Sequence, residues 1–132
     1  MPKKVIVPTS LNFQPRPSYP YSPGAQAGGM IFTAGQVAWD ESGKIIAIGD
    51  IRGQTQQTLK NVRAVLNAGG ADFDDVVKCN VYLKDMNDFK VMNEEFLRAF
   101  PNNPPARTTV QTPMAEKDML VEIEVVAFVG TI

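Results

Sequence analysis

Two segments with helical spacing stand among segments with strand-like alternation, and this arrangement limits the fold more than any other feature of the sequence. Between about residues 50 and 68, the residues that would share one face of a helix recur at three- and four-residue steps, and Gly69-Gly70 follows as a helix stop. A second stripe follows a cap at Asn87 or Asp88. The stripes consist of Ile51, Thr55, Leu59, Val62, Val65 and Leu66, and of Phe89, Met92, Asn93, Phe96, Leu97 and Phe100. We expect two amphipathic helices.

Strand-like segments surround the two helical ones. They cover residues 4–7, 30–36, 44–48, 76–83, 107–112 and 120–129. The turn residues Asp40 to Gly43 predict a hairpin between the second and third of these segments. In the fourth, one face carries Val77, Cys79, Val81 and Leu83. The order β-β-β-α-β-α-β-β predicts an α+β fold with both helices on one face of a sheet, and a core position for Cys79.

The last strand-like segment has apolar residues on both faces. One face carries Val121, Ile123, Val125 and Ala127. The other carries Leu120, Val126 and Phe128 together with Glu122 and Glu124. Because the helices are expected on only one side of the sheet, burial against another subunit would cover this second face.

Prolines punctuate the chain between the first two strand-like segments. Pro8, Pro15, Pro17, Pro20 and Pro23 precede Gly28-Gly29, and this density disfavours helix and sheet interior alike. We expect residues 8–29 to be irregular. A loop of this length is either functional and tied down by packing, or a flexible N-terminal tail.

Length and composition exclude several classes of protein. The 132 residues suit one domain, residues 1–132, and 13 basic residues scattered among 14 acidic ones make no stripe for nucleic acid. The apolar run before Pro8 is too short for a signal peptide or membrane span, so we expect a cytoplasmic protein without a membrane partner. The chain has no histidine and one cysteine, which excludes Ser-His-Asp and Cys-His nucleophilic sites.

Metal and phosphate sites find no support in the sequence. The acidic cluster Asp72, Asp74 and Asp75 has no continuing pattern of oxygen ligands, so we interpret it as a solvated turn. Neither a Walker-type loop nor a Gly-x-Gly-x-x-Gly motif is present. An enzyme built on this chain would use carboxylates, arginine, backbone groups and water.

A few polar residues are candidates for chemistry. Arg107 follows Pro104-Pro105-Ala106 at the start of a strand, where it either binds a carboxylate in a bidentate manner or makes a structural ion pair. Glu122 and Glu124 share a strand face; if this face is buried, at least one needs a partner or a raised pKa, and otherwise both face solvent.

Two further side chains have open roles. Asn93 is the polar member of an otherwise apolar helical stripe, so it points into a cavity or satisfies a backbone group. Tyr21, in the proline-rich segment, closes a pocket or anchors packing.

Taken in order, these motifs resemble the RidA/YjgF family along nearly the entire chain. They are Tyr21 in Tyr-Pro-Tyr-Ser-Pro, Ile31-Phe32-Thr33-Ala34-Gly35-Gln36, Gln57 to Asn61 leading to Ala68-Gly69-Gly70, Val76-Val77-Lys78, Asp88-Phe89 with Asn93, Pro105-Ala106-Arg107, and Val121-Glu122-Ile123-Glu124. Each motif alone is weak, but the ordered set, closed by Pro-Ala-Arg and Glu-Ile-Glu, is specific.

The resemblance implies a chorismate-mutase-like α+β fold with a mixed sheet, assembled as a homotrimer with small-molecule sites in clefts between subunits. Carried over to this chain, Arg107 would bind the substrate carboxylate and Glu122 would position or activate water. Tyr21 and the backbone at Gly35 would line the cleft, with Asn93 and Thr109 as further substrate-binding residues.

The chemistry implied by the resemblance is hydrolytic deamination at a C–N bond without a cofactor. Enamines such as 2-aminoacrylate, which pyridoxal-phosphate enzymes release, tautomerise to imines, and water then converts these to 2-keto acids and ammonia. The expected activity is therefore that of a 2-iminobutanoate/2-iminopropanoate deaminase, which detoxifies a reactive metabolite. Orientation of the imine and one proton-transfer group would accelerate a reaction that already proceeds slowly in water.

Two positions depart from the family pattern. Ala34 stands where the family often has serine, and loses one hydrogen bond to substrate or water. Thr109 stands where it often has cysteine, so thiol-linked regulation is not expected there. Since Arg107 and Glu122 persist, we expect retained activity with a shifted substrate preference.

Three other readings stay open. The chain could prefer another enamine acid, such as the aminoacrylate of pyrimidine breakdown, to whose deaminases residues 1–8 have a short likeness, or 2-aminomuconate. It could also be a trimeric protein that binds keto acids for regulation without turnover. An endoribonuclease, an activity sometimes attributed to relatives, has no physical support in a chain with an acidic pI and no histidine.

Overall fold

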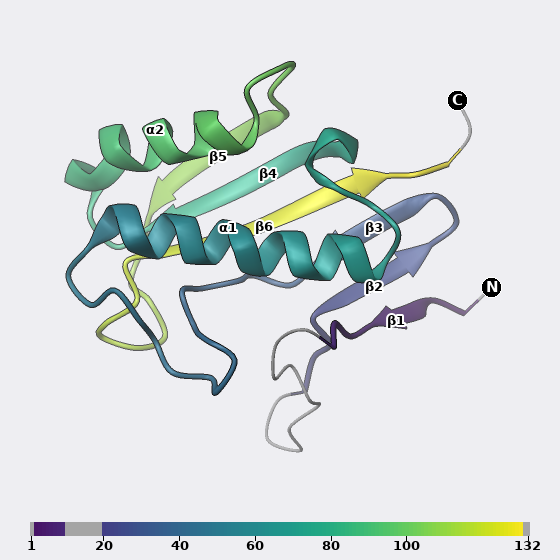
Figure 1. Cartoon of the computed structure of the whole chain (residues 1–132), viewed down its shortest axis with the longest axis horizontal. Helices are drawn as coiled ribbons and strands as arrows, with labels where there is room; N and C mark the ends of the chain where they lie inside the picture. The colour runs from purple at the N-terminus through teal and green to yellow at the C-terminus, as the bar shows by residue number, and fades with distance from the viewer. Residues whose placement is uncertain (1, 10–19, 131–132) are drawn as a thin grey trace.

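A six-stranded mixed sheet forms one layer of the fold and two helices form the other (Figure 1). The computed structural model describes residues 2–9 and 20–130. The strands lie in the order β1-β2-β3-β6-β4-β5, and β4 and β5 form the parallel pair while the other neighbours are antiparallel. The strands are β1 (Lys4–Ile6), β2 (Gly24–Ala27), β3 (Met30–Thr33), β4 (Val76–Leu83), β5 (Ala106–Gln111) and β6 (Val121–Phe128).

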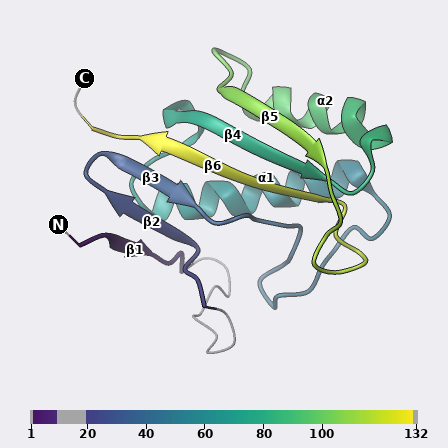
Figure 2. The ribbon, with the colours of Figure 1, turned by 180° about the vertical axis from the view of Figure 1, so that it is seen from behind.

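The helices are α1 (Ile51–Ala68) and α2 (Phe89–Ala99), and two short 3-10 turns, η1 (Phe73–Asp75) and η2 (Met86–Asp88), precede β4 and α2. Both helices cover the same face of the sheet, as predicted, and the opposite face is bare in one chain (Figure 2). Parallel strands need a crossover, and α2 provides it between β4 and β5.

Helix α1 occupies the span that its apolar spacing predicts. Asp50 caps its first turn by accepting a hydrogen bond from the Gly53 N–H at 3.1 Å, and Gly70, with φ +84°, lies just past its end. The predicted stripe packs on the sheet, and Cys79 lies in the core as expected. Burial raises the pKa of the Cys79 thiol to about 12.

The predicted hairpin between residues 30–36 and 44–48 does not form as two strands of the sheet. Residues 44–48 form no named strand and pair with the segment after β3, through an isolated bridge between Trp39 and Ile45 and a hydrogen bond from the Ile46 N–H to the Ala38 carbonyl oxygen at 2.9 Å. The turn at residues 40–43 does exist, since the Asp40 carboxylate accepts from the Ser42 and Lys44 N–H groups. It closes a loop because β3 already has both of its edges paired, with β2 and with β6.

The strand that was missed lies inside the stretch predicted to be irregular. Residues 24–27 follow the last proline and form β2, which pairs with both β1 and β3. Gly28, with φ +56°, makes the tight turn from β2 to β3 possible. Pro15 and Pro17 lie outside the described residues. The order of element types is as predicted: the strand predicted at residues 30–36 is β3, and β2 takes the place of the strand predicted at residues 44–48.

Val77 is not on the core face of β4. Its side chain is 49% exposed, whereas Val76 is buried. The register between β4 and β6 shifts between Val76 and Lys78, so a bulge inserts one residue and turns Val77 outward. Beyond the bulge, the predicted alternation holds from Cys79 to Leu83.

The stripe on α2 is only partly buried. Met92, Phe96 and Phe100 are in the core, but Leu97 is 61% exposed. The helix instead turns Glu95, 4% exposed, toward α1, where Arg52 (2.5 Å) and Gln56 (2.9 Å) donate to its carboxylate. A carboxylate can be buried here because two donors on α1 compensate its lost hydration.

Candidate functional site

A pocket of about 280 Å³ opens beside β6, between the segment after β3 and the loop that precedes β6. Its lining consists of Tyr21, Ala34, Gly35, Val37, Trp39, Ala115, Met119 and Glu122. Most of these side chains are apolar, and among the described lining residues the charged one is Glu122. Tyr21 is 55% exposed, so its ring lies at the rim.

Gly35 and Glu122 are in close contact inside this pocket. A Cβ atom placed on Gly35 would lie 2.1 Å from Glu122 Oε2 and 2.7 Å from its Cδ. The backbone hydrogen bonds between Gln36 and Ile123, at 2.8 and 3.0 Å, hold the two segments together. Glycine is therefore the residue that lets the carboxylate approach the backbone here.

Two features of the surroundings shift the pKa of Glu122 in the same direction. Burial raises the pKa of this carboxyl above its ordinary value, and the neighbouring charge of Glu124 raises it further. Glu124 is itself hydrogen-bonded by the Tyr82 hydroxyl across the β4–β6 pair, and that bond raises the pKa of Tyr82 to about 12. A carboxyl of raised pKa in an apolar pocket suits proton transfer.

Arg107 is held on the other side of the sheet by α2. Its NH2 group donates to Asn93 Oδ1 at 2.6 Å, and its guanidinium lies over the rings of Phe96 (4.7 Å) and Phe89 (5.6 Å). NH1 also contacts Met92 Sδ at 3.8 Å. Burial lowers the pKa of Arg107, but a guanidinium stays protonated at neutral pH.

Arg107 also makes no ion pair with any of residues 2–9 and 20–130. The alternative that it makes a structural ion pair is therefore not borne out within these residues. A half-buried, oriented guanidinium without a carboxylate partner is a site for an anion.

The predicted site residues fall into two groups on opposite faces of the sheet. Arg107 pairs in register with the buried Cys79 and points toward the helices, whereas Glu122 pairs with Tyr82 and points away from them. Tyr21 and Gly35 belong with Glu122, and Asn93 belongs with Arg107. One chain alone does not bring the arginine and the glutamate together.

Thr109 lies two residues beyond Arg107 on the same strand and on the same face. Its hydroxyl is buried and has no hydrogen-bond partner among the described residues. Substrate binding by Thr109 stays a prediction.

Sequence reasoning did not find the apolar wall of the pocket. Val37, Trp39 and Met119 line it, and Phe96 lies beneath the guanidinium of Arg107. The available signal was Trp39, the single tryptophan of the chain, standing beside the polar turn at residues 40–43. A large aromatic residue at such a place marks a surface that it packs against.

The described part of the chain has neither a metal cluster nor a membrane-spanning helix. Residues 2–9 and 20–130 contain no group of three or more Cys, Asp or Glu side chains able to hold a metal ion. Within the same ranges, neither helix has the length and apolar character needed to cross a membrane.

Known proteins resemble the chain in sequence and in structure. The sequence model of the family described as Endoribonuclease L-PSP matches residues 12–129. A RutC family protein from Pyrococcus horikoshii is 46% identical over 114 residues, covering 86% of this chain and 90% of that one.

Two solved structures superpose closely. RidA from the Antarctic bacterium Psychrobacter sp. PAMC 21119 has a TM-score of 0.83 at 30% identity, covering 95% of this chain and 98% of that one. TdcF from E. coli, solved with bound serine, has a TM-score of 0.80 at 33% identity, with the same two coverages.

Proposed function

Because the chain belongs to the Endoribonuclease L-PSP family, in which its relatives are RutC and RidA proteins, we propose that it hydrolyses enamine and imine acids of the 2-aminoacrylate type to 2-keto acids and ammonia. The observation that carries the proposal is the carboxyl of Glu122, which has a raised pKa and faces Gly35 in an apolar pocket. The second support is Arg107, which is oriented for an anion and has no ion-pair partner among the described residues.

The proposed reaction uses one water molecule and no cofactor. The enamine first tautomerises to the imine. Glu122 takes a proton from water, whose oxygen bonds to the imine carbon, and the C=N bond becomes a C–N single bond. Glu122 returns this proton to the nitrogen, which gives a carbinolamine. Glu122 then takes the proton of the new hydroxyl group and passes it to the amino nitrogen; the C–N bond breaks, ammonia leaves, and the C=O bond of the keto acid forms. Orientation and general acid–base catalysis of this kind each accelerate reactions, the latter by roughly 10²- to 10⁴-fold.

We further propose that the site is completed between subunits of a homotrimer. Arg107 and Glu122 lie on opposite faces of the sheet in one chain, so the arginine of one subunit would meet the glutamate pocket of the next. Figure 2 shows the sheet face without helices. By register this face carries Phe32 (47% exposed) and Val110 (42% exposed), and burial of these side chains favours association.

The bound serine of TdcF supports the choice of substrate class. Serine carries the carboxylate and the nitrogen-bearing carbon that the proposed substrates also carry. The pocket described here offers one carboxylate and no basic residue among its described lining, which does not favour an RNA phosphate backbone.

The test generates 2-aminoacrylate in situ with a serine dehydratase and traps the remaining imine. Wild type should accelerate keto-acid release, and Arg107→Ala and Glu122→Ala should each lose the acceleration. If wild type leaves the decay unchanged but binds keto acids, the protein is a binding protein and the proposed catalysis is wrong.

Mixing the two inactive variants tests the intersubunit site. In randomly mixed trimers of Arg107→Ala and Glu122→Ala chains, about one quarter of the sites would combine an intact arginine with an intact glutamate from a neighbour. Activity should return on mixing. A site made within one chain gives no recovery, and sedimentation of wild type as a monomer at micromolar concentration would contradict the trimer directly.

A further inference from the structure

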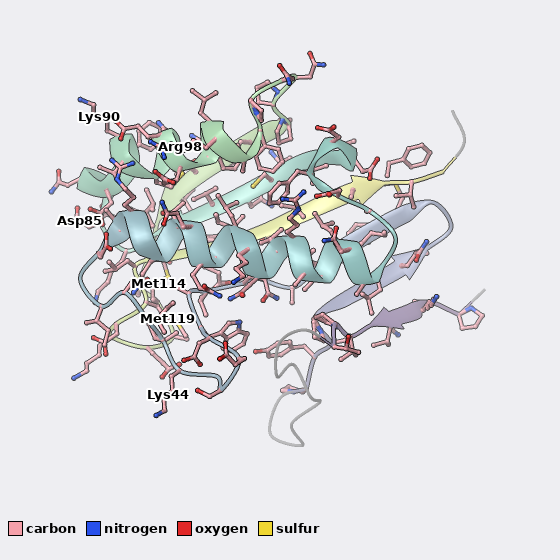
Figure 3. The ribbon with its side chains drawn as sticks, viewed as in Figure 1. Lys44, Asp85, Lys90, Arg98, Met114 and Met119 are labelled. Carbon is pink, nitrogen blue, oxygen red and sulfur yellow. The ribbon has the colours of Figure 1, made fainter. Side chains whose placement is uncertain are left out.

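The pocket has one wall that the proposed reaction does not use. Glu122 and Gly35 lie on the side where water would act, and the largest apolar side chains of the remaining lining are Val37, Trp39 and Met119. Met119 comes from the loop between β5 and β6, on the same side of α1 as Met114 in Figure 3. Such a wall contacts the part of a substrate that does not react.

This wall is held in place by amide side chains of α1. Asn61 Nδ2 donates to the carbonyl oxygens of Val37 (2.8 Å) and Trp39 (2.9 Å). Gln57 Nε2 donates to the Trp39 carbonyl at 3.1 Å and to Asn61 Oδ1 at 2.9 Å. These bonds fix the segment after β3 against a helix of the core.

A third amide side chain of α1 fixes the opposite loop. Gln54 is fully buried; its Nε2 donates to the Asp118 carbonyl at 2.7 Å and its Oε1 accepts from the Leu120 N–H at 2.9 Å. Met119 lies between these two anchored residues and is itself buried. The wall is thus preorganised, and a rigid apolar wall discriminates between substrates by size and polarity.

The volume of the pocket exceeds the need of the smallest substrate. Its 280 Å³ correspond to roughly nine water molecules at about 30 Å³ each. The three-carbon 2-aminoacrylate has about six non-hydrogen atoms, and its carboxylate is assigned to Arg107 rather than to this pocket. Space remains along Trp39 and Met119 for a longer side chain.

We propose that the wall of Val37, Trp39 and Met119 determines specificity and selects enamine and imine acids with an uncharged aliphatic side chain of three or more carbons. The proposal rests on the proposed function for the reacting end of the substrate. A substrate with an acidic side chain is disfavoured, because the described lining offers no cation and already contains Glu122.

Trp39 makes the inference measurable without turnover, because it is the one tryptophan of the chain and it lines the pocket. Its fluorescence should report the binding of 2-keto acids, the stable products of the reaction. Titrations of the wild-type protein would compare pyruvate, 4-methyl-2-oxopentanoate and 2-oxoglutarate. We expect the branched acid to bind at least about tenfold more tightly than pyruvate, and 2-oxoglutarate more weakly than either.

Met119→Ala tests the wall itself. Removing this side chain should weaken binding of 4-methyl-2-oxopentanoate about tenfold while changing pyruvate binding much less. Met114→Ala is the matched control, because Met114 belongs to the same loop but does not line the pocket, and its ranking of the three acids should equal that of wild type. Met119→Leu, which keeps the apolar volume, should preserve the preference.

The outcomes separate this inference from the proposed function. Equal affinities for pyruvate and the branched acid, or tightest binding of 2-oxoglutarate, would overturn the inference even if imine hydrolysis is accelerated. The expected ranking without any acceleration of imine hydrolysis would support the specificity wall and contradict the proposed deaminase activity. Absence of both binding and acceleration would contradict both.

Discussion

The carboxylate of Glu122 lies directly against the backbone of Gly35, so that a Cβ at this glycine would overlap Oε2 at 2.1 Å. Because Gly35 has no side chain, there is room at this point for the carboxylate of Glu122, the acidic residue of the described pocket lining. Under the proposed function this contact holds the group that activates water. Substitution of Gly35 should therefore test the position of the carboxylate as directly as substitution of Glu122 tests its chemistry.

Gly35→Ala should lower kcat/KM for imine hydrolysis by about 10²-fold or more, because the new methyl group displaces the Glu122 carboxylate from its position. A double-mutant cycle provides the control: once Glu122 is alanine, the same change at Gly35 should cost little further activity. Equal losses in the two backgrounds would mean that Gly35 acts independently of Glu122.

Glu124→Gln should move the acidic limb of the pH–rate profile to lower pH. Glu122 must be ionised to accept a proton, so activity falls as pH falls through its pKa, which burial and then Glu124 raise above the ordinary value. Glutamine removes the neighbouring charge and can still accept from the Tyr82 hydroxyl. An acidic limb that stays at the same pH or moves to higher pH would show that the limb does not report the ionisation of Glu122.

Asn61→Ala should destabilise the fold by about 1–3 kcal/mol, because the carbonyl oxygen of Val37 loses a buried hydrogen bond and that of Trp39 loses a partly buried one. Chemical denaturation at neutral pH measures this difference. Since the same bonds hold the apolar wall, Asn61→Ala should also reduce the preference for the branched keto acid in the folded protein. If Asn61→Ala is destabilised but keeps the full preference, these hydrogen bonds stabilise the fold without positioning the apolar wall.

Local sequence patterns predicted the elements that depend on local contacts. The span of α1 follows from its apolar spacing and its glycine stop, and β4 follows from the alternation ending at Leu83. The strand assigned to residues 44–48 failed because pairing is a non-local competition, and β2 and β6 occupy both edges of β3. The bulge that exposes Val77 likewise depends on β6, not on β4 alone.

The candidate site was predictable in its residue types but not in its arrangement. The order of motifs pointed to Arg107, Glu122 and Gly35, and the structure joins the last two in one pocket. The sequence around Arg107, Ala-Arg-Thr-Thr-Val-Gln, has no clear apolar alternation, so it did not reveal which face the arginine occupies. Trp39 and Met119 are far apart in sequence, and only the loops anchored by α1 bring them to one wall.

Asn93→Asp should raise KM about tenfold or more while affecting kcat much less. Asn93 Oδ1 accepts from Arg107 NH2 at 2.6 Å, and an aspartate of the same shape would place a carboxylate there. This carboxylate pairs with the guanidinium and competes with the substrate carboxylate for it. Steady-state kinetics with imines generated in situ measures the effect, and thermal unfolding should show no loss of stability, since the new pair is charge-assisted. Asn93→Ala is the matched control, because it removes the hydrogen bond without adding a competing anion and should raise KM less than the aspartate. An unchanged KM in Asn93→Asp would mean that Arg107 does not bind the substrate carboxylate.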